Sequence, residues 1–451
     1  MRAAAYCGES INMIVLQNIW WWLVLIGVMI LIHELGHFWA ARFFDVRVEA
    51  FSFGFGPRLF GFRRGETDFR FSLILFGGYV KMAGEQLGEE EAANDPRSLG
   101  AKPRWQRLII AFAGPAMNII LAVVLLTGLF MFHFEKVASM SQPAIIGYVE
   151  KGSPAEAAGL RERDRIVRIN GKWNPLWQDV RMEEVGSAKR PMTVVVERDG
   201  KTIVNTVTPV MDDKLGGALA GWEPQTEVEV GGVMHGMDAE KQGLKRGDVV
   251  LSVNGMPIRS ISKLHDVLRD SNGAPVTVVY QRDGKQHTAA IQPSKSNLDG
   301  QNRWMIGVQL SSGLTVTKLP FPEALRESIK QNIEGTTLIY QFLRGIVERR
   351  MSPKSLDGPI RIAQLSGEAA REGPSVFIGL MAMVSLNLAV FNLLPIPILD
   401  GGMIMMLLIE ILMRRDLSMA VKEAVLKMGM VFLMIVVVFV LYNDISKILP
   451  G

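Results

Sequence analysis

Two histidines four residues apart, with a glutamate beside the first, form the part of this sequence best suited to catalysis. His33 and His37 would lie one turn apart on the same face of a helix, so both imidazoles can bind one zinc ion. Glu34 is then placed to act as a general base that activates water for hydrolysis. The alternative is two anchoring histidines and a glutamate that extends its carboxylate to solvent.

A catalytic zinc site also needs a third protein ligand and one open position. The single cysteine, Cys7, excludes both a disulfide framework and zinc held by cysteines, so the ligands must be His, Asp or Glu. The best acidic candidate is Asp400, in the stretch Asn-Leu-Leu-Pro-Ile-Pro-Ile-Leu-Asp-Gly-Gly. Pro395 and Pro397 in this stretch remove backbone donors and open the helix. The alternative is that Asp400 only caps a helix end.

Four long apolar stretches supply the elements that must hold these residues. A helix of about 20 residues crosses a bilayer, and the stretches that satisfy this are 19–41, 108–132, 376–398 and 426–442. His33 and His37 lie in the first stretch, and Asp400 ends the third. The sequence therefore predicts a polytopic membrane protein.

The positive charges predict the direction of each span. Eleven Lys and Arg residues lie between the first two stretches. Arg414, Arg415 and Lys422 lie between the last two, with Lys427 at the start of the fourth, whereas Arg2 precedes the first and Lys447 follows the last. Short loops rich in Lys and Arg stay in the cytoplasm, so both termini and the long 133–374 segment are expected outside. The first and third spans then run in the same direction, which brings the three candidate ligands to one depth near the cytoplasmic side.

The segment between the second and third stretches contains one pattern twice, at a fixed offset along the chain. This ungapped match indicates two copies of one compact domain. The recurring pairs include Gly159 and Gly243, Asp164 and Asp248, Asn170 and Asn254, and Arg198 and Arg282. Residues 158–171 resemble a bacterial, circularly permuted PDZ domain, which implies binding of peptides or protein termini by strand addition. The alternative is that both copies are spacers.

Two alternating apolar segments after the first stretch predict a β-hairpin. Residues 46–50 and 69–73 alternate apolar and polar side chains, with glycines at a turn between them. We expect an edge strand near 69–75 to bind the substrate by strand addition and to hold it extended near zinc. The residues expected to contact the substrate are Phe69, Phe71 and Leu73. The alternative is an ordinary cytoplasmic hairpin that packs against the spans.

These motifs together resemble the site-2 protease family of intramembrane zinc metalloproteases, and the paired PDZ domains resemble its regulator-of-sigma-E protease type. The resemblance implies a fold of four transmembrane helices, a membrane-associated β-hairpin and two inserted α+β PDZ domains. It also implies Zn²⁺ bound by His33, His37 and Asp400, water activated by Glu34, and Asn392 as a residue that holds substrate or stabilises the oxyanion. Gly114, Pro115 and Asn118 match a further family pattern. The chain departs at Met403, where the family often has His. The family's Pro-x-Gly-Gly-Tyr-Val is also shifted or lost, with Phe76 directly before Gly77-Gly78-Tyr79-Val80.

The predicted organisation has five parts. They are 13–135 with the first two transmembrane helices and the hairpin, 138–214 and 222–312 as the PDZ domains, 315–372 as an amphipathic helical linker, and 373–446 with the last two transmembrane helices. Residues 84–100 are expected to be a flexible linker. Met13 opens a more membrane-like sequence than Met1 and is an alternative start.

The resemblance implies a protease of the bacterial cytoplasmic (inner) membrane. Its expected substrates are single-span membrane proteins within the lipid bilayer, such as an anti-sigma factor, or signal-peptide remnants. The net charge of +4 reflects topology, so nucleic acid is not an expected partner. Two other classes of protein are an inactive membrane scaffold and a transporter. The complete set of four catalytic residues argues against the first, and the lack of paired inverted halves against the second.

Overall fold

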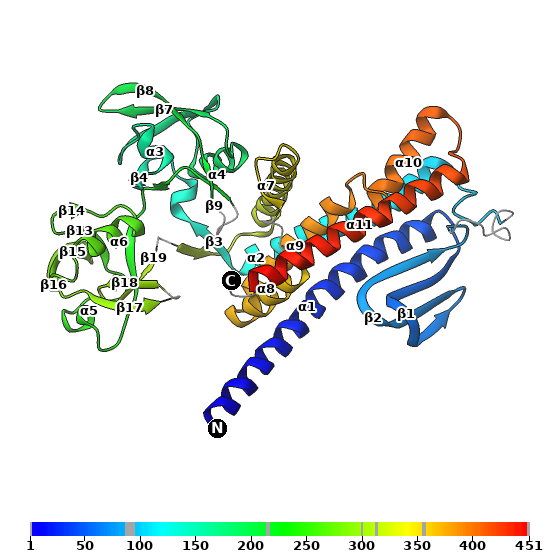
Figure 1. Cartoon of the computed structure of the whole chain (residues 1–451), viewed down its shortest axis with the longest axis horizontal. Coiled ribbons are helices and arrows are strands. Elements are labelled where there is room, and N and C mark those ends of the chain that lie inside the picture. Colours follow the sequence, from blue (N-terminus) through cyan, green and yellow to red (C-terminus); the bar gives the residue numbers. More distant parts are fainter. Residues whose placement is uncertain are drawn as a thin grey trace. The chain divides into compact units, whose positions relative to one another are not determined.

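The structure is a computed structural model that describes residues 2–85, 95–212, 217–298, 301–311, 314–353 and 358–448. The chain divides into two compact units (Figure 1). Unit 1 comprises Met1–His133, Lys318–Tyr340 and Pro353–Gly451, and unit 2 comprises Phe134–Thr317 and Gln341–Ser352. Most of the predicted linker at 84–100 lies outside the described residues.

Long apolar helices dominate the described part of unit 1. Four segments are long and apolar enough to cross a membrane, namely Met13–Phe43, Arg104–Phe132, Pro374–Asn392 and Met419–Ser446. They belong to helices α1 (Arg2–Phe43), α2 (Arg104–Phe132), α9 (Pro374–Asn392) and α11 (Met419–Ile448). The remaining helices are α7 (Phe321–Val347), α8 (Pro359–Glu372) and α10 (Asp400–Met413). α1 packs against α2 and α8, while α2 also packs against α9 and α10.

Gly36, inside the His-Glu-x-x-His motif, lets α1 and α2 approach closely. A Cβ atom at this position would lie 2.3 Å from the carbonyl oxygen of Ala113 in α2. Earlier in α1, Leu25 and Met29 are fully buried in a cluster that includes Phe377 of α9. The motif therefore sits where its helix is pressed against a neighbour, which fixes the direction of its side chains.

The third predicted span is shorter in the structure than in the sequence prediction. The prediction extended this helix over 376–398, but α9 ends at Asn392. Pro395 and Pro397 follow in a turn, and Ile398 adopts a positive φ of 88°. A new helix, α10, then begins at Asp400. Asp400 therefore begins α10 and does not end the third span. Hydropathy cannot separate the turn from α9, because the turn is as apolar as the helix before it.

The predicted hairpin is present, but its strands are paired differently. The two strands, β1 (Val48–Arg64) and β2 (Thr67–Met82), are long, and several β1 residues each stand opposite two residues of β2. Phe51 stands opposite both Val80 and Phe69, and Phe69 also stands opposite Phe62. The segment 67–71 is therefore an inner strand, and the outer strands are 58–64 and 78–82. The predicted edge strand at 69–75 was wrong for its first part, because Phe69 and Phe71 already have β1 residues on both sides.

Unit 2 contains two modules whose elements repeat at the offset seen in the sequence. Helix α4 (Trp177–Gly186) corresponds to α6 (Ile261–Asp270), and strands β7 (Met192–Arg198) and β8 (Lys201–Val207) correspond to β15 (Val276–Arg282) and β16 (Lys285–Ile291). The first module also contains β4 (Ile146–Val149), α3 (Pro154–Ala157), β5 (Arg165–Ile169), β6 (Lys172–Trp173), β9 (Val210–Asp212), β10 (Gly217–Leu219) and β11 (Trp222–Pro224). The second contains β12 (Val228–Val233), α5 (Asp238–Lys241), β13 (Val249–Val253), β14 (Met256–Pro257), β17 (Ser294–Leu298), β18 (Gln301–Met305) and β19 (Val308–Ser311). A strand pair, β3 (Phe134–Val137) with β20 (Leu314–Thr317), joins the ends of unit 2.

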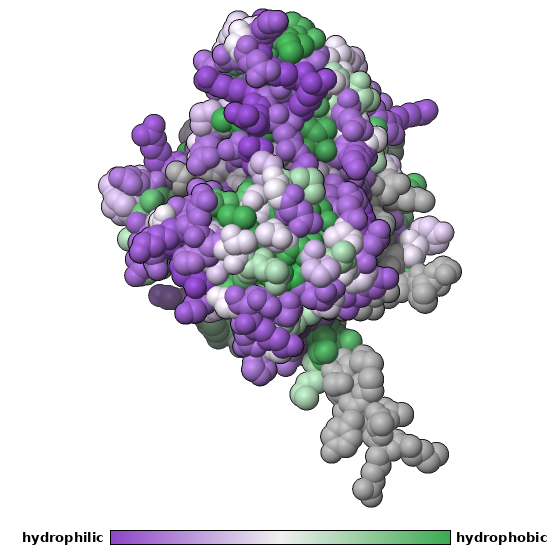
Figure 2. All heavy atoms as spheres, turned by 90° about the vertical axis from the view of Figure 1, so that its left-hand side faces the viewer, coloured by the Kyte–Doolittle hydropathy of each residue, from purple (hydrophilic) through white to green (hydrophobic). Residues whose placement is uncertain are grey.

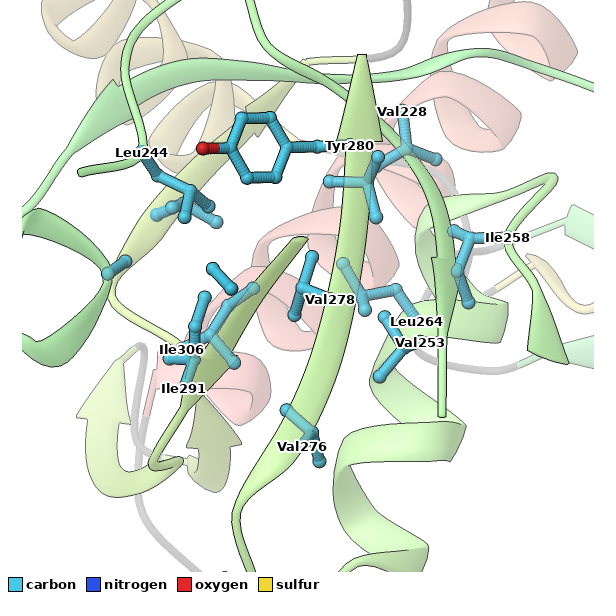
Figure 3. Packing of buried hydrophobic residues seen from close by; sticks show 14 of the residues in the cluster. Val228, Leu244, Val253, Ile258, Leu264, Val276, Val278, Tyr280, Ile291 and Ile306 are labelled. Carbon is cyan, nitrogen blue, oxygen red and sulfur yellow. The ribbon is translucent and has the colours of Figure 1, made fainter. Parts of the chain in front are cut away.

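Each module has a hydrophobic core of its own. In the second module, Val278 of β15 and Leu264 of α6 are fully buried in one cluster, whose members point into the space between sheet and helix (Figure 3). The first module has an equivalent cluster around Trp177. The side of the molecule that carries β8, β16 and α5 is mostly hydrophilic (Figure 2). On this face, the modules therefore combine a hydrophilic surface with hydrophobic cores.

A buried ion pair recurs in both modules. The Arg282 guanidinium donates hydrogen bonds to both carboxylate oxygens of Asp248, at 2.7 Å each, and to the carbonyl of Gly243. Arg198 makes the same contacts with Asp164 and the carbonyl of Gly159. Burial tends to raise the pKa of Asp248, but the hydrogen bonds from Arg282 outweigh this and hold that pKa below 3.8.

Candidate metal centre

Three potential metal ligands from distant parts of the chain converge in unit 1. His33 Nε2 lies 3.1 Å from Asp400 Oδ2, and His37 Nε2 lies 3.4 Å from Asp400 Oδ1. The two Nε2 atoms are 3.3 Å apart, and all three ligand atoms fall within 4.8 Å of one another. Both histidines are less than 9% exposed. Two imidazoles and a carboxylate at this spacing are a donor set that suits zinc.

His37 is held in the tautomer that a metal requires. Its Nδ1 lies 2.8 Å from the Ile110 carbonyl oxygen of α2, which can only accept a hydrogen bond. Nδ1 must therefore carry the proton, and the Nε2 lone pair points toward His33 and Asp400. Such a hydrogen bond to the second ring nitrogen is typical of metal-binding histidines, because it fixes both ring orientation and tautomer.

Asn118 of α2 contacts the Nδ1 atom of His33. Its side-chain amide lies 3.2 Å from His33 Nδ1, and Asn118 is completely buried. As placed, Asn118 Nδ2 faces His33, while Asn118 Oδ1 is buried with no partner among the described residues. Exchanging the amide oxygen and nitrogen by a flip would pair Oδ1 with a protonated His33 Nδ1, and would leave His33 Nε2 free to bind metal. This orphaned oxygen is explained if His33 binds zinc through Nε2, so the residues present fit the ion.

Gly114 leaves the space that both imidazoles occupy. A Cβ atom on Gly114 would lie 2.2 Å from His37 Nε2 and 2.8 Å from His33 Nε2. Since real Cβ atoms do not approach heavy atoms this closely, no larger residue is compatible with the observed ring positions. The backbone of α2 therefore forms one wall of the site.

Asp400 is presented by the turn between α9 and α10. Cβ atoms on Gly401 and Gly402 would lie 2.2 Å from the Leu394 carbonyl oxygen and 2.4 Å from that of Ile396. The two glycines thus let the first turn of α10 pack directly on the proline-containing turn. As the first residue of α10, Asp400 also places its negative charge at the positive end of the helix dipole.

Glu34 lies at the edge of the same site. It lines a cavity of about 190 Å³ together with the three ligands and with Tyr79, Val80 and Met82 of β2. A backbone hydrogen bond links its carboxylate to Val80, and Gly78 leaves room for its side chain. A carboxylate beside the metal ligands, on a cavity large enough for water, can accept and deliver protons.

A model of peptidase family M50 matches residues 21–436 of the chain. The chain belongs to peptidase family M50. It is 29% identical over 452 residues to a Xylella fastidiosa protein named "Putative zinc metalloprotease", covering 95% of this chain and 99% of the relative. It is also 29% identical over 466 residues to the regulator of sigma-E protease RseP of Salmonella typhimurium, covering 96% and 99%.

Some solved structures resemble a short part of the chain. The PDZ domain of an SdrC-like protein from Listeria monocytogenes shares 23% identity, with a TM-score of 0.17, and covers 19% of this chain and 87% of its own. The family match and the named relatives identify this M50 peptidase as a zinc metalloprotease.

The remaining predicted residues do not gather at the site. Asn392 is the last residue of α9 and is not among the described residues that line the 190 Å³ cavity. Phe69, Phe71 and Leu73 do not line it either, and the β2 residues that do are Tyr79, Val80 and Met82. Met403, which replaces a frequent family histidine, lines the cavity as an apolar side chain.

A buried ion-pair cluster fixes the far end of α10 in this M50 peptidase. Glu410 is 1% exposed, and it accepts hydrogen bonds from Lys422 Nζ at 2.7 Å and from the Leu417 amide at 3.0 Å. Arg107 of α2 lies 3.8 Å from the second Glu410 oxygen. The cluster thereby joins α10 to α2 and α11. Since Asp400 begins α10, the same contacts help to fix the position of the third ligand.

Proposed function

We propose that this M50 peptidase cleaves membrane-spanning segments of single-span membrane proteins. The observation that carries the proposal is the convergence of His33 and His37, on a helix long and apolar enough to cross a bilayer, with Asp400 at the start of α10. Ionisable residues are costly in such helices and persist there for function. The regulator of sigma-E protease among the relatives supports a regulatory substrate such as an anti-sigma factor, and signal-peptide remnants are a second class.

The proposed chemistry assigns a separate task to each group. Zinc, held by His33, His37 and Asp400, would supply Lewis-acid polarisation of the peptide carbonyl and lower the pKa of water. Glu34 takes a proton from the attacking water and then delivers it to the leaving amine. The Val80 backbone keeps the Glu34 carboxylate on the cavity. Asn392, at the end of α9, is proposed to hold substrate next to this centre.

A peptide bond in a transmembrane helix is shielded by its own hydrogen bonds, so the substrate must be extended before it is cut. We assign this task to the outer strand 78–82, because Tyr79, Val80 and Met82 line the cavity that contains the ligands. An outer strand offers backbone groups to an added strand. Leu59, Phe60 and Phe62 on the other outer strand are more than half exposed, which supports contact of the hairpin with lipid.

The remaining assignments complete the proposal. The excess of Lys and Arg in the loop between α1 and α2 supports a cytoplasmic location for that loop. Both termini and unit 2 would then lie outside the cytoplasmic membrane, with the metal centre near its cytoplasmic side. The two modules are proposed to be PDZ domains that bind peptides or newly formed protein termini, with the boundaries predicted from the sequence.

The test uses purified full-length protein and a model single-span substrate in detergent. Glu34→Gln is expected to retain zinc and to lose cleavage, because an amide cannot accept the proton. Glu85→Gln is the matched control, since Glu85 lines the same cavity and its carboxylate accepts a hydrogen bond from the Met82 amide. Zinc content is measured by elemental mass spectrometry. Cleavage by Glu34→Gln at the wild-type rate would exclude the proposed proton transfer.

A further inference from the structure

The end of α4 in the first module carries an apolar surface that another part of the same chain covers. Ala188, Ala218 and Met351 are fully buried together, and Met351 belongs to the segment 341–352. Four partly buried side chains complete the contact, namely Val185 and Met211 from the module and Phe342 and Ile346 from the segment. The segment, hereafter the docked segment, comprises the last residues of α7 and the turn that follows.

The turn after α7 brings the docked segment back onto the module. Arg349 adopts a left-handed φ of 57°, and the amides of Arg350 and Met351 both donate to the Gly345 carbonyl. Such a reversal is a common helix ending. Gly345 makes it possible, because a Cβ atom there would lie 2.9 Å from the Met351 side chain. Met351 can therefore reach the same apolar surface as Phe342 and Ile346.

Charged groups add direction to this apolar contact. The Arg350 guanidinium donates to the carbonyl oxygens of Gly186 and Ala188, at 3.2 and 3.3 Å, and its side chain is only 11% exposed. These carbonyls lie at the C-terminal end of α4, where a cation is favoured by the helix dipole. Glu348 also bonds to Arg190 of the module at 2.8 Å. The docked segment is thus recognised by both shape and charge.

The second module provides an internal comparison for this surface. At the offset that relates Gly159 to Gly243, four apolar positions of the first module become polar in the second. The matched pairs are Val185 and Arg269, Ala188 and Asn272, Met211 and Lys295, and Ala218 and Asn302. The Arg269 side chain is 63% exposed, and Asn272 is also exposed. Although the two modules share their cores and their buried ion pair, the apolar surface is present only in the first.

We propose that residues 341–352 are a resident ligand of the first module. They occupy the surface at the end of α4, so a peptide from outside reaches this surface only after it displaces them. A competing peptide would need the same chemistry, with apolar side chains spaced like Phe342, Ile346 and Met351 and an arginine at the position of Arg350. The inference goes beyond the proposed function and does not depend on zinc or on cleavage.

The experiment measures whether the surface is closed in the intact chain. The probe is a fluorescein-labelled synthetic peptide with the sequence of residues 340–353, and the protein is the full-length chain in detergent. A double variant, Phe342→Asp with Met351→Asp, should release the docked segment and bind the probe at least tenfold more tightly than the wild type. Arg350→Gln, which keeps the apolar contacts, should give an intermediate affinity and guards against a variant that misfolds.

Two further variants locate the bound probe. Adding Ala188→Asp to the double variant should abolish binding, whereas adding Asn272→Asp at the matching position of the second module should leave it unchanged. Hydrogen exchange provides an independent readout, since the amides at the end of α4 should exchange at least tenfold faster in Arg350→Gln while those of α6 do not change. Equal affinity of wild type, Arg350→Gln and the double variant would overturn the proposal, as would binding that survives Ala188→Asp.

Discussion

Gly114→Ala tests whether the observed ring positions are those that bind zinc. The added Cβ would lie 2.2 Å from His37 Nε2, whereas ordinary contact begins at 3.4 Å, so the ring must retreat. His33 Nε2, at 2.8 Å, must also shift. The difference between 2.2 Å and 3.4 Å requires the His37 ring to move by about 1 Å. A misplacement of that size can cost about 100-fold in rate. We therefore expect at least a 100-fold loss of cleavage together with weaker zinc binding.

The assay compares Gly114→Ala with Gly128→Ala on the same helix. A Cβ at Gly128 meets no atom within 4 Å, and alanine is the better helix former at both positions. Zinc affinity is measured by competition with a chelator, cleavage with a model single-span substrate, and folding by thermal unfolding in detergent. Gly128→Ala should match the wild type in all three. If Gly114→Ala also bound zinc and cut substrate normally, the proposed metal centre would have the wrong geometry.

Three other substitutions separate metal binding from folding. Asn118→Leu should weaken zinc binding and cleavage about 10- to 100-fold, because His33 loses the partner that fixes its ring; unchanged chelator competition would contradict this. Glu410→Ala should lower the free energy of unfolding by about 3 kcal/mol by breaking a buried pair, whereas Glu423→Ala, which removes an exposed pair with Lys427, should change it by less than about 1 kcal/mol. Arg282→Ala should destabilise the second module by about 3 kcal/mol near neutral pH. The pKa of Asp248 is lower in the folded protein than in the unfolded chain. The ion pair therefore stabilises the folded protein fully above the unfolded-state pKa, and this stabilisation is lost as pH falls through the folded-state pKa. Thermal unfolding of wild type and Arg282→Ala should therefore converge in acid, and a constant difference would refute the role of this pair.

Local patterns in the sequence predicted the parts of the site that depend on local geometry. His33 and His37 share a helix face because of their spacing alone, and the internal repeat established the correspondence of the two modules. Asn118 received no role, because its contact with His33 depends on how α1 and α2 pack. Spacing within one helix carries no information about that packing. Gly114 contributed to a family resemblance, but nothing in the sequence provided a physical reason for a glycine there. The reason is the imidazoles that lie beside it in the structure.

Two errors in the fold prediction have physical causes. The third span was drawn through Pro395 and Pro397 because a buried apolar turn has the hydropathy of a helix, and only the start of α10 at Asp400 separates them. The edge strand was placed at Phe69 and Phe71 because alternation shows which residues form a strand, not how many neighbours it has. The alternation pattern does not reveal that one strand pairs with two parts of its partner.

The distance along the chain between His37 and Asp400 bears on when the protease can become active during its synthesis. The two histidines are translated early, but the carboxylate proposed to complete their site follows all of unit 2 and the helices α7 to α9. A nascent chain that has inserted only α1 and α2 has two imidazoles and no third ligand. On the proposed function, the enzyme would therefore not cut neighbouring membrane proteins while it is being made, and a truncated product would be inactive for the same reason.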